Sequence, residues 1–282
     1  MKDIEELSKM VAKLLSEAIK SKTSAKHAEL PPPGSTFTWN FADGFREVTR
    51  PSLIDPTILT GIDNQKSRFY FNIERFLSGA PSHDVLLWWE RGSGKSSLVR
   101  SLPLVFTEQK MALVSVTEEQ IPNFPRLMEA LVGDERRWVV YLDDLSFESP
   151  GGHYRELKSI LEGGVEERPE NTVMVVTSNR RHLTVETFAD EREIHPGESV
   201  AELVSLADRF GLSLGFYTFD ESTYLEAVKK HLDTLGLSRK AGKWQPEAIR
   251  WAMARGIRSG RTAKQFAVEW SGVVGAKGNQ PR

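Results

Sequence analysis

The chain has 282 residues, of which 39% are hydrophobic and 27% charged, and its formal net charge is −2. This balance is typical of a globular protein with one large domain or two modest ones. The small net charge excludes a global field that would draw the chain onto nucleic acid or an anionic membrane. The absence of cysteine excludes disulfides and thiolate metal sites.

The sequence shows neither a signal-like segment nor an apolar run long enough to cross a bilayer, so we expect a soluble cytoplasmic protein. At its start, residues 1–22 carry apolar side chains at the spacing of one helix face. This amphipathic helix is expected either to pack on its own domain or to dock on a partner, and both alternatives stay open. The run Pro31-Pro32-Pro33-Gly34 cannot continue a helix, so we interpret 23–52 as a linker and short N-terminal extension, with a short strand within 36–50.

Farther along, apolar strands alternate with helices. The predicted strands are 85–88, 111–116, 138–142, 173–177 and 212–216, and helices are predicted at 126–131 and 154–161. Continuous apolar strands that alternate with helices predict a parallel sheet covered on both faces, here with five strands.

The last part of the chain has a different pattern, because it contains helical periodicity only. The predicted helices are 221–235, 246–255 and 261–270. The sequence therefore predicts an α/β core over 53–219, a small α-helical lid over 220–272 and a flexible tail over 273–282.

A glycine-rich turn, Glu90-Arg91-Gly92-Ser93-Gly94-Lys95-Ser96, separates the first predicted core strand from a helix. The order of strand, glycine-rich turn and helix is that of a phosphate-binding loop, in which backbone N–H groups surround phosphate oxygens. Lys95 would reach the β- and γ-phosphates, and the Ser96 hydroxyl would ligate Mg²⁺. We therefore predict an ATP and Mg²⁺ site built from Arg91, Gly92, Ser93, Gly94, Lys95, Ser96 and Ser97.

This loop departs from the full pattern G-x-x-x-x-G-K-[ST] at its first glycine, which is replaced by Trp89. If that position needs a positive φ, a residue other than glycine costs about 1–2 kcal/mol there. We also expect the indole ring to crowd the strand that carries Asn179. The loop is therefore expected to form, with reduced nucleotide affinity or turnover.

Polar residues follow two of the predicted strands, at the edge where such sheets bind ligands. Asp143, at the end of one strand, could hold Mg²⁺ through water, and Asp144 could orient or deprotonate the attacking water, with help from Glu148 if Asp144 is too short. Asn179 follows the next strand, and its amide could contact the γ-phosphate. Aspartate and asparagine also cap turns, and a glycine-rich turn can arise by chance. The occurrence of the glycine-rich turn and these polar strand ends in one chain favours a nucleotide site over separate turn caps.

These residues together resemble the AAA+ superfamily of P-loop ATPases and, more narrowly, an uncharacterised bacterial family of predicted AAA+ ATPases. The resembling stretches run in order along the chain and are 59–66, 86–98, 141–148, 157–164, 177–183, 207–211 and 258–263.

The resemblance implies roles for further residues. The segment 59–65, with Gly61 and Ile62, would pack on adenine, and Asn179 would be the first sensor. Arg209 would be an arginine finger that reaches the nucleotide of a neighbouring subunit. Arg261, with Arg258 as its close competitor, would be the lid sensor for the γ-phosphate. Each arginine could instead be an ordinary surface ion-pair partner.

The preferred function is an ATPase that cleaves ATP at subunit interfaces of a homo-oligomer, expected to be a ring, and moves its lid to remodel or load an unknown protein client. A nucleic-acid role rests on analogy alone, and no membrane role is expected. One alternative is a nucleotide-switched scaffold in which Trp89 weakens or prevents hydrolysis. Another is a P-loop small-molecule kinase, which the all-helical C-terminal part with Arg261 disfavours.

Overall fold

A computed structural model describes residues 35–145, 154–162, 168–179, 206–237 and 243–278. The predicted N-terminal helix over 1–22, the first part of the predicted linker and extension (23–34), and Glu148 lie outside the described residues. Within them, no helix is long and apolar enough to cross a membrane.

The core is a seven-stranded sheet in the order β2-β1-β4-β5-β6-β3-β7. All five predicted strands are present and pair in parallel: β3 (Val85–Trp89), β4 (Met111–Val116), β5 (Arg137–Leu142), β6 (Thr172–Thr177) and β7 (Leu212–Phe216).

The predicted number of five strands was too low. β1 (Thr36–Asn40) adds to β4 in parallel, and β2 (Gly44–Glu47) pairs with β1 as an antiparallel hairpin. The hairpin extends the sheet because Phe37 and Trp39 are buried against its core. Part of the predicted N-terminal extension therefore belongs to the core sheet.

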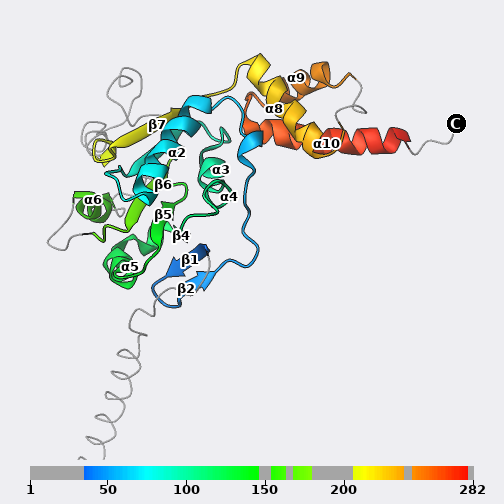
Figure 1. Cartoon of the computed structure of the whole chain (residues 1–282). Coiled ribbons are helices and arrows are strands. Elements are labelled where there is room, and N and C mark those ends of the chain that lie inside the picture. Colours follow the sequence, from blue (N-terminus) through cyan, green and yellow to red (C-terminus); the bar gives the residue numbers. More distant parts are fainter. Residues whose placement is uncertain (1–34, 146–153, 163–167, 180–205, 238–242, 279–282) are drawn as a thin grey trace, which may run out of the picture.

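Helices cover both faces of the sheet (Figure 1). One face carries α2 (Asp63–Leu77), α3 (Lys95–Val99) and α4 (Leu102–Val105), and the other carries the 3-10 helix η2 (Glu118–Asn123), α5 (Phe124–Leu131) and α6 (Tyr154–Glu162). The inner strands β3 to β6 are largely apolar because each of their faces packs on a helix layer. In β5, Trp138 and Val140 face the α5 layer, whereas Val139 and Tyr141 face the α2 layer.

Three helices form the lid: α8 (Glu221–Thr234), α9 (Gln245–Ala254) and α10 (Gly260–Gly278). They pack around a small core of their own that includes Tyr224, Leu232 and Phe266, and Figure 1 shows them beside one end of the sheet. The fold is thus the predicted α/β core with a helical lid. α10 continues to Gly278, so the predicted tail from 273 is helical over most of its length.

Candidate functional site

The loop between β3 and α3 depends on positive φ angles. Trp89 has φ 83°, Gly92 has φ 78° and Gly94 has φ 111°. Gly92 also lies against the lid, because a Cβ there would be 2.9 Å from the Cβ of Arg261. The Gly92 carbonyl accepts a hydrogen bond from the Arg261 backbone N–H at 3.1 Å. The loop and the lid are therefore in direct contact.

Trp89 occupies a backbone conformation that favours glycine, as the loop pattern predicted, at a cost of about 1–2 kcal/mol. Its ring centroid lies 4.9 Å from that of Tyr217 and 5.7 Å from that of Trp88. Tyr217 follows β7, and β7 and β6 flank β3 on opposite sides. The contact with Tyr217 therefore lies on the β7 side of β3, and crowding of the strand that carries Asn179 stays a prediction.

Lys95 sits at the centre of the loop with only 5% of its surface exposed. Its ammonium donates to the carbonyl oxygens of Trp89 and Glu90, both at 2.8 Å, and to Oδ1 of Asn179 at 2.9 Å. Burial lowers the pKa of Lys95 to about 8, although the charges of Asp144, Glu90 and Asp143 oppose the shift. A buried cation of this kind is stabilised when an anionic ligand comes next to it.

The polar ends of β5 and β6 meet this loop. Ser96 Oγ donates to Asp143 Oδ1 at 2.8 Å, and the Asn179 amide donates to Asp144 Oδ1. Asn179 thus bridges Lys95 and Asp144. Asp144 has φ 55°, and its N–H donates to Thr177 Oγ1 at 2.8 Å. Residues that are far apart in sequence therefore converge at the carboxyl edge of the parallel sheet, where ligands of such folds bind.

Ser96 and Asp143 fit the predicted magnesium site, because hydroxyl and carboxylate oxygens are the donors that Mg²⁺ prefers and the two side chains are in contact. Among the described residues, no cluster of three or more histidine, aspartate or glutamate side chains could hold a metal by itself. Mg²⁺ is commonly held by one or two carboxylates together with the phosphates of a nucleotide. The donor set therefore suits a cation that arrives with its ligand.

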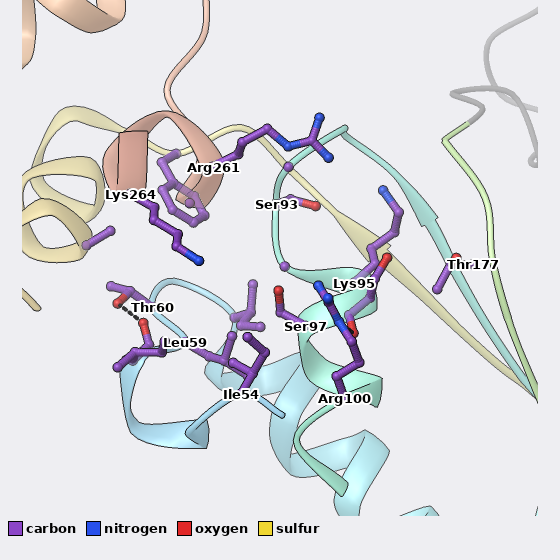
Figure 2. Close-up of a pocket in the computed structure, with 18 of the residues that line it drawn as sticks. Ile54, Leu59, Thr60, Ser93, Lys95, Ser97, Arg100, Thr177, Arg261 and Lys264 are labelled. Atoms are coloured by element: carbon purple, nitrogen blue, oxygen red, sulfur yellow. Dashed lines mark hydrogen bonds between the residues drawn. The ribbon is translucent and has the colours of Figure 1, made fainter. Parts of the chain in front are cut away.

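A cavity of about 390 Å³ lies between the loop, the segment before α2 and the lid (Figure 2). Its apolar part is lined by Ile54, Ile58, Leu59, Ile62 and Phe219. Figure 2 shows the Arg261 side chain extending over the loop, and the Lys264 side chain reaching into the space above Thr60. The volume and the division into an apolar part and a cationic part suit a ligand of nucleotide size.

Most of the predicted site residues meet in this cavity. Those that line it are Ile62, Gly92, Ser93, Gly94, Lys95, Ser96, Ser97, Asp143, Asp144, Asn179 and Arg261. Gly61 and Arg91 are not among the lining residues. Gly61 has φ 71°, and a Cβ there would overlap the Thr223 side chain of α8. In this structure Gly61 allows α8 to approach the segment before α2.

Two of the predicted arginines lie elsewhere. Arg209 is in the turn before β7, and its Nε donates to Glu162 Oε1 of α6 at 2.6 Å. Arg258 pairs with Glu221 at 3.5 Å. Of the two competing lid arginines, Arg261 lines the cavity and Arg258 does not.

Sequence reasoning missed several residues of the site. Arg100, Lys264 and His231 line the cavity, and Thr177 and Tyr141 contact Asp143. Helix spacing could have indicated Lys264, which follows Arg261 by one turn of α10. Tyr141 lies two residues before Asp143, and therefore on the same face of the strand.

Comparisons with known proteins agree with this architecture. Residues 34–274 match the family model described as "Protein of unknown function (DUF815)". The Aeropyrum pernix Orc1 protein, solved in complex with DNA, is 13% identical with a TM-score of 0.54, over 80% of this chain and 63% of that chain.

The Thermotoga maritima RuvB Holliday junction branch migration motor is 14% identical with a TM-score of 0.44, over 76% of this chain and 70% of that chain. No curated protein matches significantly. The likeness to Orc1 shows the fold, so the predicted AAA+ P-loop fold is confirmed. Because the family model matches most of its length, the chain belongs to the family described as "Protein of unknown function (DUF815)".

Proposed function

We propose that this protein binds ATP with Mg²⁺ in the cavity beneath the lid and hydrolyses it. The observation that carries the proposal is the environment of Lys95, a buried ammonium held on the carbonyls of its own loop, at the entrance of a helix and beside a nucleotide-sized cavity. Phosphate oxygens would replace these neutral partners with charged ones, which form stronger hydrogen bonds to an ammonium.

The other residues of the cavity have complementary roles in this proposal. Ser96 and Asp143 would hold Mg²⁺, which supplies charge neutralisation between phosphate oxygens. Asp144 would orient or deprotonate the attacking water, and Asn179 would fix both that water and Lys95. Arg261 would bring the lid onto the γ-phosphate, because its backbone already contacts Gly92.

Arg209 extends the proposal to an assembly. It lies outside the cavity of its own subunit and is held by Glu162 on the surface of α6. We propose that it enters the site of a neighbouring copy, so that the active form is a homo-oligomer, expected to be a ring. Lid movement would then act on a protein client.

The direct test is a titration of the purified full chain with a fluorescent ATP analogue and Mg²⁺. We expect Lys95→Ala to weaken binding by about 100-fold, because a phosphate loses a hydrogen bond from a charged donor worth about 1.5–3 kcal/mol. The solution mass should also be measured with and without nucleotide. We expect the native chain to assemble when nucleotide is bound and not in its absence.

Lys110→Ala is the matched control, because Lys110 forms an exposed ion pair with Glu135 far from the loop. Its affinity for the analogue should equal that of the native chain. Thermal unfolding of both variants separates loss of the site from loss of the fold. Equal binding by native protein and Lys95→Ala would refute the proposed site.

A second candidate, a nucleotide-switched scaffold with little hydrolysis, is favoured by Trp89 at φ 83°. If the strained loop limits turnover, Trp89→Gly should raise the steady-state ATPase rate severalfold, because glycine removes a strain of about 1–2 kcal/mol. Trp89→Ala is the control, since it removes the ring and keeps a side chain at the same φ. A native rate that Trp89→Gly leaves unchanged would argue against this candidate.

A further inference from the structure

Three hydroxyl groups converge on a single oxygen of Asp143. Tyr141 donates to Asp143 Oδ1 at 2.5 Å, and Ser96 and Thr177 donate to the same atom at 2.8 Å each. Tyr141 and Thr177 are almost fully buried, whereas Asp143 is exposed to the cavity. One oxygen of the carboxylate is thus held by buried side chains of the sheet.

The sheet register explains this convergence. Tyr141 and Asp143 are two residues apart in β5 and its extension, so they share a face of the sheet. On β6, Val175 pairs with Tyr141, which places Thr177 beside Asp143. Both strands point these residues toward α3, which begins with Lys95 and Ser96.

The direction of each hydrogen bond can be assigned. Thr177 Oγ1 accepts the Asp144 N–H at 2.8 Å, so its own proton is free to go to Asp143. Tyr141 Oη donates to Asp143 Oδ1, because a carboxylate oxygen can only accept. Ser96 differs from both, because in the proposed function its hydroxyl turns toward the cation.

We propose that Tyr141 and Thr177 are positioning residues that hold Oδ1 of Asp143 and present only Oδ2 to the cation accompanying the nucleotide. This inference rests on the proposed function. A carboxylate that offers one oxygen suits Mg²⁺, which keeps several waters and an octahedral shell. It suits Ca²⁺ less well, because Ca²⁺ takes more oxygen ligands and often binds a carboxylate through both oxygens. The buried hydroxyls thereby favour Mg²⁺ over Ca²⁺.

The test measures binding of a fluorescent ATP analogue to the full chain while Mg²⁺, or Ca²⁺ in a parallel series, is titrated. We expect Tyr141→Phe and Thr177→Val to raise the half-saturating Mg²⁺ concentration about tenfold, as removal of groups that orient a metal ligand does elsewhere. The affinity for the analogue in EDTA should stay within about twofold of native, and the preference for Mg²⁺ over Ca²⁺ should narrow.

Tyr70→Phe is the matched control, because Tyr70 also loses a hydrogen-bonded hydroxyl, shared with Ser101 at 2.6 Å, away from Asp143. It should leave the Mg²⁺ titration unchanged. Tyr141→Phe removes one oxygen and no carbon, so it keeps the test decisive if Thr177→Val does not fold.

An unchanged half-saturating Mg²⁺ concentration in Tyr141→Phe would overturn the inference. So would an equal loss of affinity in EDTA, because the hydroxyl would then support the whole loop. Neither result concerns ATP binding by the native chain, so neither contradicts the proposed function. A native chain that binds no analogue at all would overturn the proposed function and this inference together.

Discussion

Replacing Arg209 by alanine is expected to lower the ATPase kcat of the assembled protein by about 10³-fold or more, the scale of an arginine finger. Nucleotide affinity should change little, because Arg209 does not line the cavity of its own subunit. The change removes a partly exposed ion pair with Glu162, and a pair of this kind contributes at most about 1 kcal/mol to the stability of the fold. Steady-state phosphate release, compared with analogue binding, separates the two effects.

Mixing variants tests whether the arginine acts between subunits. An Arg209→Ala subunit keeps its own loop, and a Lys95→Ala subunit keeps its arginine. If Arg209 acts in trans, each variant alone is inactive and their mixture recovers part of the native rate. No recovery from a mixture that assembles normally would contradict a trans role.

The matched control for Arg209 is Arg126→Ala, which removes an exposed arginine paired with Glu129 on α5. It should keep the native rate. Equal slowing by both substitutions would mean that the loss reflects surface charge and not a specific contact with the neighbouring site.

The parts of the fold that were predictable are those in which local pattern and burial coincide. Four of the five core strands, β3 to β6, are nearly continuous apolar runs because helices cover both faces, and that signal is strong in the sequence. For the β1–β2 hairpin the sequence predicted one short strand within 36–50, which corresponds to β1, but it did not predict β2 or the place of the hairpin in the sheet. Its place in the sheet depends on pairing with β4, a contact that local sequence does not encode.

The residues of the site also divide into those that local sequence predicts and those that depend on the tertiary structure. Lys95, Ser96 and Asp143 were predictable because each belongs to a short motif whose chemistry requires that residue type. Thr177 was not, because its contact with Asp143 depends on the register between β5 and β6. For Tyr141, strand alternation gave the shared face with Asp143 but not the hydrogen bond between them. The lid residue Lys264 likewise enters the cavity only through the packing of α10 against the loop. A sequence motif identifies the residues that contact the ligand, whereas the residues that position them are determined by tertiary contacts.

Asp144→Asn is expected to lower the hydrolysis rate by about 10²–10⁴-fold, the usual contribution of general acid–base catalysis, and to leave nucleotide binding intact. Asparagine suits this position because it tolerates the positive φ that Asp144 adopts, and its backbone N–H can still donate to Thr177. Its side-chain oxygen can also accept the hydrogen bond that Asn179 gives Asp144. The substitution therefore removes the basic oxygen with little change in shape.

Single-turnover phosphate release measures the chemical step of Asp144→Asn, and analogue titration measures its binding. Because the nucleotide would stay bound, this variant should hold the nucleotide-dependent assembly longer than the native chain does, which a time course of solution mass can follow. A native single-turnover rate in Asp144→Asn would mean that another group activates the water, and Asp144 would then serve only to orient Asn179 and, through it, Lys95.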